Sequence, residues 1–212
     1  NVKKVVALST DKAAGPINLY GATKLCSDKL FTSARSYMGK RNIKFSVVRY
    51  GNVMGSRGSV LPVFMNQKNK NIFPITHPQM TRFNISLKES VDTVAWVFNN
   101  MLGSEIFVPK IKSFYITDLA RAINDRCKFK YIGIRPGEKL HEEMITKSDS
   151  INTVNYGNYY AILSPFGKYD VKRYCKVTKS KKVKDGFSFS SEKNGKFLTV
   201  QELKKIIKNT II

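Results

Sequence analysis

The stretch that decides the fold is Ser9-Thr10-Asp11-Lys12, together with Tyr20-Gly21-Ala22-Thr23-Lys24 shortly after it. The apolar run Val5-Val6-Ala7-Leu8 precedes it and is typical of a strand that is buried on both faces of a parallel sheet. Open α/β sheets bind ligands where their strands end. The polar side chains that follow the run are therefore candidate site residues, and the predicted fold class is α/β.

A helix is predicted to begin at Leu19, because Gly15-Pro16 indicates a turn and Asn18 is a suitable N-cap. Tyr20 and Lys24 then stand at positions i and i+4 over one helix face. Two unit charges ~4 Å apart interact by about 4 kcal/mol at an effective dielectric of about 20, so the ammonium can favour a phenolate. A tyrosine held in this way can exchange a proton at working pH, although the spacing is also that of an ordinary surface pair.

The composition is that of a globular protein: the 212 residues are 42% hydrophobic, and no apolar run approaches the ~20 residues of a membrane span. The three cysteines, Cys26, Cys127 and Cys175, are scattered and odd in number. The sequence shows no paired Cys/His spacing, which argues against a metal site and favours a reducing, cytoplasmic compartment. We therefore expect neither a metal nor a membrane segment.

The formal net charge of +22 invites a nucleic-acid hypothesis. The basic residues are mostly interspersed with asparagine and apolar residues, and they are densest in the tail from Lys168 to Lys208. The sequence contains no recognition-helix, RNP-like or zinc-finger motif. The pattern favours a lysine-rich solvated surface over a nucleic-acid site, and its positive field suits an anionic ligand.

The remaining chain alternates predicted strands and helices. Strands are expected at residues 44–50, 72–76, 105–109, 131–134 and 159–163, and helices at 85–101, 117–123 and 199–207. The first strand, helix and strand then form a parallel βαβ crossover. The apolar stripe predicted for the helix at 85–101 includes Val91, Val94, Ala95 and Phe98, and that of the first helix includes Leu30.

Three further features are candidate ligand contacts. The glycine-rich loop at residues 51–59 follows a predicted strand and can expose backbone amide donors. Arg135 and Glu138 flank a Pro-Gly turn and can point the same way, and Arg82 carries a planar fork of donors that suits phosphate oxygens. Each feature also has an ordinary explanation. The loop could be a simple connection, Arg135 and Glu138 a surface ion pair, and Arg82 a solvated arginine.

The run STDKAAGPINLYGATKLCSDKLF at residues 9–31 resembles the active-site segment of the extended short-chain dehydrogenase/reductase superfamily. Within it, the chain resembles the soluble inverting UDP-N-acetylglucosamine 4,6-dehydratases, which start pseudaminic acid synthesis. Retaining relatives carry Thr-Asp-Glu in place of Thr10-Asp11-Lys12, and large membrane-bound relatives tend to place Met at the position of Tyr20. RYGNVMGSRGSVLP at residues 49–62 and RPGEKLHE at residues 135–142 resemble the same family.

The resemblance implies roles for particular residues. It implies catalytic roles for Thr10, Asp11, Lys12, Tyr20 and Lys24. It implies contacts to an NADP cofactor for Leu8, Ser9, Tyr20, Lys24, Val53, Met54, Gly55, Ser56 and Arg57. It implies contacts to a UDP-sugar for Asn52, Arg82, Arg135 and Glu138, with the arginines on phosphate and Glu138 on ribose hydroxyls. His141 is interpreted as structural.

The implied reaction is the NADP-dependent dehydration of UDP-N-acetylglucosamine, with inversion at carbon 5, to a UDP-4-keto-6-deoxy-hexosamine. Hydride leaves carbon 4 and returns at carbon 6, while Tyr20 removes the carbon 4 hydroxyl proton. Lys12, if its buried setting deprotonates it, is the candidate base at carbon 5. Asp11, assisted by Thr10, would protonate the departing carbon 6 hydroxyl.

The G-x-G-x-x-G turn that holds a dinucleotide pyrophosphate is not found, since Gly55-Ser56-Arg57-Gly58 lacks its spacing. We therefore expect residues 1–110 to be the C-terminal part of a Rossmann-type catalytic domain without its first βαβαβ half. Residues 111–212 are expected to form a substrate-binding lobe and a basic tail, with the two lobes interleaved. The strand at 5–8 should expose an edge, and the chain should be inactive without the missing N-terminal half.

Two alternative functions remain open. The chain could belong to a nucleotide-sugar 4-epimerase or reductase of the same superfamily, or it could be an inactive fragment that binds anions or nucleic acid. A complete enzyme of the first kind is expected to be a homo-oligomer.

Overall fold

The structure is a computed structural model that describes residues 1–69 and 71–210. The chain forms two compact units, each built from three separate segments. The first unit comprises residues 1–50, 88–110 and 143–189, and the second comprises residues 51–87, 111–142 and the chain from residue 190 onward. The units are interleaved along the chain, and no single boundary at residue 110 separates them.

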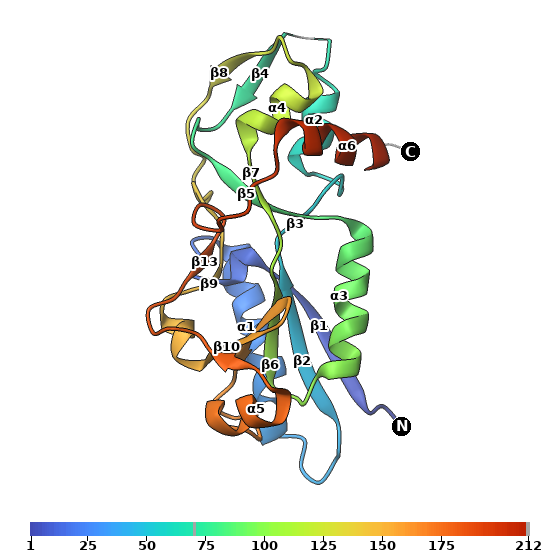
Figure 1. The fold of residues 1–212 in the computed structure, drawn as a ribbon, viewed down its shortest axis with the longest axis vertical. Helices are drawn as coiled ribbons and strands as arrows, with labels where there is room; N and C mark the ends of the chain where they lie inside the picture. Colours follow the sequence, from blue (N-terminus) through green and yellow to red (C-terminus); the bar gives the residue numbers. More distant parts are fainter. Residues whose placement is uncertain (70, 211–212) are drawn as a thin grey trace. The chain divides into compact units, whose positions relative to one another are not determined.

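The first unit is built on a six-stranded sheet with the strand order β1-β2-β6-β11-β10-β12 (Figure 1). Its strands are β1 (Lys4–Thr10), β2 (Lys44–Tyr50), β6 (Glu105–Pro109), β11 (Tyr159–Leu163), β10 (Thr153–Tyr156) and β12 (Lys181–Lys182). β1, β2 and β6 are parallel, whereas β11 runs antiparallel to β6 and β10 antiparallel to β11. The predicted strands at 44–50, 105–109 and 159–163 and the α/β class are confirmed.

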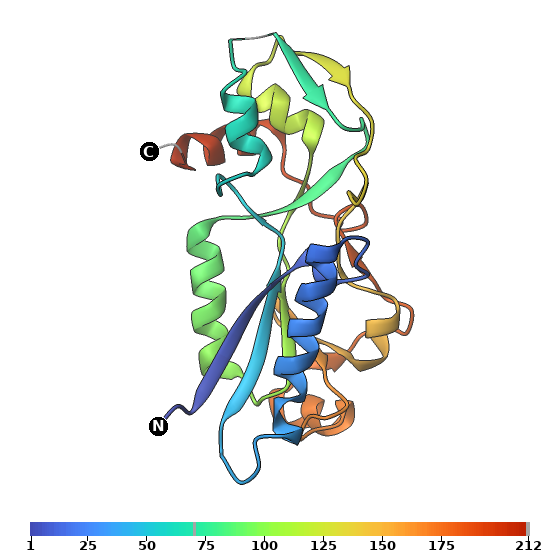
Figure 2. The ribbon, with the colours of Figure 1, turned by 180° about the vertical axis from the view of Figure 1, so that it is seen from behind.

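Helices α1 (Leu19–Ser33) and α3 (Leu87–Asn100) cover opposite faces of this sheet (Figures 1 and 2). On the α3 face, Val97 packs in one apolar cluster with Val48 and Phe107 of the sheet. The start of α1 is as predicted, because the Asn18 side chain accepts a hydrogen bond from the Gly21 backbone N–H at 2.8 Å. The cap thus fixes where the helix that carries the predicted tyrosine and lysine begins.

The predicted apolar stripes of the two helices are partly wrong. Val91 of α3 is 58% exposed, and Ala95 and Phe98 are also exposed. The buried positions of α3 are instead Ser90, Thr93 and Val97. Leu30 of α1 is likewise exposed, whereas Asp28 is buried. Hydrophobic periodicity misses such faces, because a hydroxyl side chain can bond to its own helix backbone and a carboxylate can be paired inside the unit.

β1 lies at the edge of its sheet and pairs with β2 alone among the described strands. Leu8 is 49% exposed, and Val5, Val6 and Ala7 are only partly buried. The expectation of a strand buried on both faces is therefore wrong for residues 5–8, whereas the expected open edge is confirmed. Such an edge presents N–H and C=O groups that can pair with a further strand.

The second unit contains a small three-stranded sheet and a parallel strand pair. The sheet consists of β3 (Asn52–Val53), β5 (Thr81–Ile85) and β7 (Ser113–Tyr115), and the pair of β4 (Ile72–Ile75) and β8 (Lys128–Tyr131). Helices α2 (Val60–Met65), α4 (Ile116–Ile123) and α6 (Val200–Thr210) contribute Leu61, Leu119 and Leu203 to its core. The strand predicted at 131–134 is wrong in position, because β8 ends at Tyr131.

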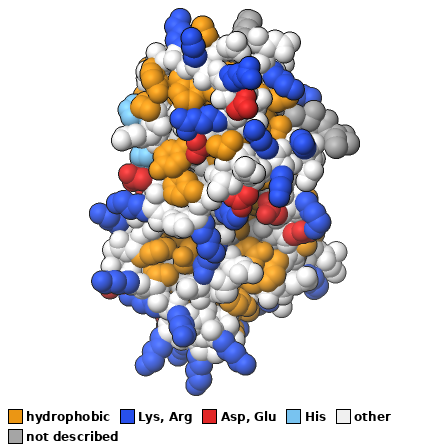
Figure 3. All heavy atoms as spheres, turned by 45° about the horizontal axis from the view of Figure 1, so that its top comes forward, with side chains coloured by type: hydrophobic (Ala, Val, Ile, Leu, Met, Phe, Trp, Pro, Cys, Tyr) orange, Lys and Arg blue, Asp and Glu red, His pale blue; other side chains and the backbone are white. Residues whose placement is uncertain are grey.

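The remaining elements are β9 (Glu143–Ile145), β13 (Phe189–Ser190), α5 (Val171–Thr178) and three 3-10 turns, Asp11–Ala13, Ala34–Ser36 and Ser148–Asn152. None of the described helices is both long and apolar enough to cross a membrane. Figure 3 shows lysine and arginine side chains spread over the visible face, with apolar and uncharged groups between them.

A buried ion pair joins α1 to β2 in the first unit. Asp28 Oδ2 accepts a hydrogen bond from Arg49 Nη2 at 2.8 Å, and Arg49 Nη1 donates to the carbonyl of Met144 at 2.9 Å. Both charged side chains are almost completely buried. Removing one member of such a pair leaves the other charge buried and uncompensated, which costs more than the intact pair contributes.

We expect Asp28→Ala to lower the free energy of unfolding by about 3–5 kcal/mol, because Arg49 would lose its hydrogen-bonded carboxylate and keep only the more distant one of Asp149, 3.9 Å from its Nη1. Urea denaturation of the 212-residue chain, followed by the fluorescence of its single tryptophan, measures this change. Asp92→Ala is the matched control, since Asp92 pairs with Lys88 on the exposed surface of α3 and should leave stability nearly unchanged. A loss below about 1 kcal/mol for Asp28→Ala would contradict the importance of the pair.

Candidate active site

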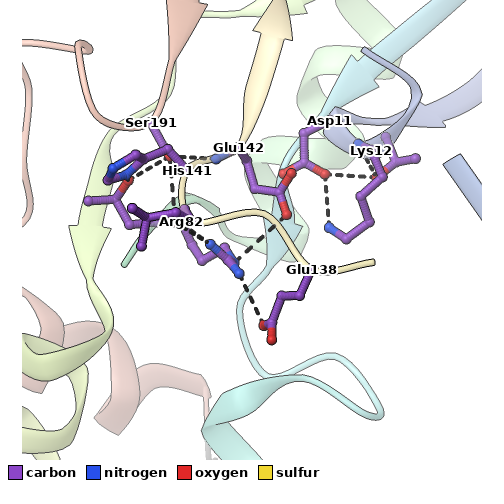
Figure 4. A network of polar contacts seen from close by, with 10 residues as sticks. Asp11, Lys12, Arg82, Glu138, His141, Glu142 and Ser191 are labelled. Carbon is purple, nitrogen blue, oxygen red and sulfur yellow. Dashed lines mark hydrogen bonds and ion pairs between the residues drawn. The ribbon is translucent and has the colours of Figure 1, made fainter. Parts of the chain in front are cut away.

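Three of the predicted catalytic residues lie together where β1 ends (Figure 4). The Asp11 side chain is buried, and its Oδ1 accepts hydrogen bonds from the Thr10 hydroxyl at 2.9 Å and from the Lys12 ammonium at 3.0 Å. The Thr10 hydroxyl also accepts a bond from the Lys12 backbone N–H at 3.4 Å. Hydrogen bonds to this one carboxylate oxygen thus fix the side chains of the two neighbouring residues in the sequence, Thr10 and Lys12.

The second carboxylate oxygen, Asp11 Oδ2, is buried and has no hydrogen-bond partner among the described residues. Nearly all buried polar atoms in proteins have a hydrogen-bond partner, so this unpaired oxygen is a candidate for contact with a ligand. Lys12 is 33% exposed, so its side chain is only partly buried, and its Nζ lies 3.0 Å from Asp11 Oδ1. The base role of Lys12 stays a prediction.

The turn that carries Asp11 and Lys12 is held against the start of α1. A Cβ atom on Gly21 would lie only 2.3 Å from the carbonyl oxygen of Lys12. Glycine is therefore required at position 21 for the turn to approach the helix this closely. The main chain of Lys12 consequently lies beside the helical turn that bears Tyr20.

Helix α1 presents Tyr20 and Lys24 in different ways. The Tyr20 side chain is 53% exposed, so its phenol is accessible to a ligand. Lys24 Nζ donates to the carbonyl of Leu8 at 3.3 Å, which ties the helix to the end of β1. Ser9, between Leu8 and Thr10, has a buried hydroxyl without a partner among the described residues. The predicted residues at the end of β1 therefore include two unpaired buried oxygens, on Ser9 and Asp11.

The glycine-rich loop at residues 51–59, which is predicted to contact the cofactor, belongs to the second unit. Asn52 and Val53 form β3, which pairs in parallel with β5. Met54 is buried in the core of the second unit, so only its backbone can meet a cofactor. The rest of the predicted contacts in this loop are exposed: Gly55, Ser56 and Arg57.

Arg82 lies in β5 and is only 5% exposed (Figure 4). Its Nη1 donates to the carbonyls of Thr81 at 2.7 Å and Leu140 at 3.1 Å. Its Nη2 donates to Glu138 Oε1 at 3.1 Å, and its Nε lies 3.8 Å from Glu142 Oε1. One edge of the guanidinium is thus held by main chain and the other faces two carboxylates, which fixes the orientation of its plane.

The Pro-Gly turn does not bring Arg135 and Glu138 together as expected. The Glu138 backbone N–H donates to the Arg135 carbonyl at 3.0 Å and closes the turn, but the Glu138 carboxylate pairs with Arg82. Arg135 is exposed, and its side chain makes no ion pair within the described chain. The guanidinium of Arg135 therefore remains accessible to an anion.

Sequence reasoning missed the residues that support Arg82: Thr81, Glu142 and Ser191. The RPGEKLHE run offered one signal, because it carries a second carboxylate four residues after Glu138. No sequence signal pointed to Ser191, because it lies 110 residues after Thr81 in the chain. The hydroxyl groups of the two residues are 2.7 Å apart. Such a contact depends on the return of the chain to the second unit near its end.

Residues 1–164 match the polysaccharide biosynthesis protein family. The chain is 51% identical, over 99% of its length, to the UDP-N-acetylglucosamine 4,6-dehydratase (inverting) of Campylobacter jejuni, of which it covers 64%. It is 39% identical, over 98% of its length, to the UDP-glucose 4-epimerase of Rickettsia bellii, of which it covers 62%. The resemblance seen in the sequence is confirmed, and the chain spans about two thirds of the length of these relatives or slightly less.

Solved structures agree with this fold. Pen from Bacillus thuringiensis superposes with a TM-score of 0.81 at 33% identity, over 98% of this chain and 62% of that one. RMD from Pseudomonas aeruginosa, solved with NADPH, gives a TM-score of 0.54 at 11% identity over 98% of this chain and 65% of that one. At that identity the second likeness shows the fold alone.

His141 is a titratable group behind Arg82. Its Nδ1 lies 2.8 Å from the Thr81 hydroxyl, and its Nε2 lies 3.7 Å from Glu192 Oε1. Burial lowers the pKa of His141 below its usual value, Arg82 and His77 lower it further, and Glu192 acts in the opposite direction. The folded state therefore binds the His141 proton less readily than the unfolded state does, so this histidine contributes more stability above about pH 6.5 than below it.

We expect the free energy of unfolding to fall as the pH decreases from about 7.5 to 5, and the fall to be smaller in His141→Asn, which cannot be protonated there. The asparagine side chain can still hydrogen-bond to the Thr81 hydroxyl, so the comparison isolates the effect of protonating His141. Denaturant titrations at several pH values measure the difference, with His77→Asn as the control for loss of an imidazole. Equal pH dependence in the wild type and His141→Asn would show that His141 does not contribute.

Proposed function

Because the chain belongs to the polysaccharide biosynthesis protein family, we propose that it supplies the catalytic and substrate-binding parts of an NADP-dependent UDP-N-acetylglucosamine 4,6-dehydratase that inverts carbon 5. It spans 64% of the length of the Campylobacter relative of that name, so the complete activity is proposed for a longer or split enzyme. We further propose that the reaction takes place in the cytoplasm and serves pseudaminic acid synthesis.

The observation that carries this proposal is the cluster of Thr10, Asp11 and Lys12 at the end of β1, beside the helical turn that bears Tyr20. Loss of water across carbons 5 and 6 needs a base for the carbon 5 proton and an acid for the departing hydroxyl. A carboxylate and an amine 3.0 Å apart can supply both groups from one site.

The ion pair also suggests a route by which both groups become active together. Passage of one proton from Lys12 to Asp11 Oδ1, along their hydrogen bond, converts the pair into an amine and a carboxylic acid. The amine then removes the carbon 5 proton while Asp11 protonates the carbon 6 hydroxyl. The carbon 5–carbon 6 double bond forms, water leaves, and the ammonium–carboxylate pair is restored. Thr10, which donates to the same Oδ1, keeps the carboxyl group oriented.

The residues at the end of β1 fit the nicotinamide end of an NADP cofactor. When bound, such a cofactor accepts hydride from carbon 4 of the hexose and returns it at carbon 6. We assign the accessible Tyr20 phenol to the carbon 4 hydroxyl proton, and Lys24 to the ribose hydroxyls and to stabilisation of the phenolate. The unpaired Ser9 hydroxyl, the Leu8 backbone and residues 53–57 would complete the contacts.

The second unit would hold the UDP part of the substrate. Arg135 has an accessible guanidinium for the diphosphate, and Arg82 presents its Nη2 edge beside Glu138. Glu138 is partly exposed, so its carboxylate can accept ribose hydroxyls while it remains paired with Arg82. Asn52, at the start of β3, is the fourth proposed contact.

We propose that an N-terminal segment of the longer or split enzyme pairs with the open edge of β1 and provides the cradle for the cofactor pyrophosphate. The 212-residue chain alone is then expected to be inactive and to bind NADP⁺ weakly. Calorimetry with NADP⁺ tests this, because tight binding by the chain alone would show that no further cradle is needed.

A second candidate reaction is 4-epimerisation, and the 39% identity to the Rickettsia UDP-glucose 4-epimerase favours keeping it. An epimerase needs the tyrosine and the cofactor but no acid and base at carbons 5 and 6. The Asp11–Lys12 pair is therefore the feature that favours dehydration.

We expect the chain, assembled with its N-terminal segment, to convert UDP-N-acetylglucosamine to a 4-keto-6-deoxy product that absorbs light in alkali. Tyr20→Phe should slow the reaction at least about 100-fold, since it removes the proton-transfer group. Tyr37→Phe is the control, because Tyr37 is an exposed tyrosine that follows α1. An epimer as the only product, or full activity of Tyr20→Phe, would contradict the proposal.

A further inference from the structure

A chain of hydroxyl groups lies next to Arg82, and Figure 4 shows two of the residues in contact with it, Ser191 and His141. The Thr81 hydroxyl is 2.7 Å from the Ser191 hydroxyl and 2.8 Å from His141 Nδ1. Thr81 and Ser191 are completely buried, and each hydroxyl oxygen has polar neighbours on two sides. Polar side chains this deep in a core need a reason, because apolar residues of similar shape would pack there at lower cost.

The chain of hydroxyls is connected to the groups that hold Arg82. The backbone carbonyl of Thr81 accepts a hydrogen bond from Arg82 Nη1 at 2.7 Å. The Ser191 hydroxyl accepts from the Glu142 backbone N–H at 2.9 Å, and the Ser191 N–H donates to the Glu142 carbonyl at 2.8 Å. Ser191 thereby fixes the backbone of Glu142, whose carboxylate lies 3.8 Å from Arg82 Nε. Two of the groups around the guanidinium are held by this one serine and its threonine partner.

The direction of the hydrogen bonds follows from the donors present. The Glu142 N–H already donates to Ser191, so Ser191 can give its own proton to Thr81, and Thr81 can give its proton to His141 Nδ1. This arrangement requires His141 to be neutral, with its proton on Nε2, toward Glu192. Every hydroxyl then donates once and accepts once. A protonated His141 would force both hydroxyls to reverse, and the Ser191 hydroxyl would then share the Thr81 carbonyl, at 3.3 Å, with Arg82 Nη1.

We infer that Thr81, Ser191 and His141 are positioning residues for Arg82, and that they hold its guanidinium ready for the diphosphate of a nucleotide sugar. The inference rests on the proposed function, since it assigns Arg82 to the substrate. A planar guanidinium binds phosphate oxygens well only when its plane is correctly oriented. Small increases in the mobility of the Arg82 side chain therefore weaken phosphate binding even in a variant that still folds. None of the three residues needs to touch the ligand.

The test measures the affinity of the 212-residue chain for UDP-N-acetylglucosamine by calorimetry at about pH 7.5. Thr81→Val keeps the shape of the side chain and removes the hydroxyl, whereas Thr81→Ser keeps the hydroxyl. We expect Thr81→Val to weaken binding about tenfold and Thr81→Ser to retain most of the affinity. His141→Leu, at a partly exposed site where folding is less at risk, should weaken binding about threefold.

Ser113→Ala is the matched control, because Ser113 is an equally buried serine of the second unit whose hydroxyl accepts a bond from Asn194 at 2.9 Å. It should lower the melting temperature about as much as Thr81→Val but leave affinity unchanged. Equal affinity of the wild type, Thr81→Val and His141→Leu would overturn this inference and leave the proposed function standing. Failure of the wild-type chain to bind the nucleotide sugar would overturn both.

Discussion

The structure depends above all on one buried carboxylate, that of Asp11, at the point where β1 ends. A charge in such a place must be compensated locally, and the two adjacent residues do this: Thr10 donates a hydroxyl proton and Lys12 an ammonium proton to the same oxygen. The missing side chain of Gly21 lets this turn rest on the helix that bears the accessible tyrosine. A strand end, a turn and a helix start are thereby fixed relative to one another, as the proposed acid–base chemistry requires.

The second unit also contains a buried charged side chain, and here the charge is positive. Arg82 is almost fully buried, and it is compensated by the carboxylates of Glu138 and Glu142 and by two backbone carbonyls. Arg135, on the same segment as Glu138, is exposed and has no carboxylate partner in the described chain. The unit therefore combines one arginine held in place with one left accessible, an arrangement suited to an anionic ligand that is recognised by geometry as well as by charge.

The sequence predicted most of the strands and the start of α1, because short apolar runs, a turn and an N-cap are local signals. It did not predict which helix faces are buried. Asp28 is buried through its pair with Arg49, and Val91 is exposed although it fits a helical apolar stripe. The site was predicted best where its residues are adjacent, as in Thr10-Asp11-Lys12. The partner of Glu138 was missed, because Arg82 stands 56 residues away and only the fold brings the two together.

The most direct measurement is the exchange of the carbon 5 proton of UDP-N-acetylglucosamine with solvent deuterium in the assembled enzyme, observed by NMR or mass spectrometry. If the Asp11–Lys12 pair supplies the base, the wild type should incorporate deuterium at carbon 5, Lys12→Ala should incorporate none, and Lys29→Ala, on the exposed surface of α1, should behave as the wild type does. Undiminished exchange in Lys12→Ala would contradict the central claim, since it would place the carbon 5 base elsewhere.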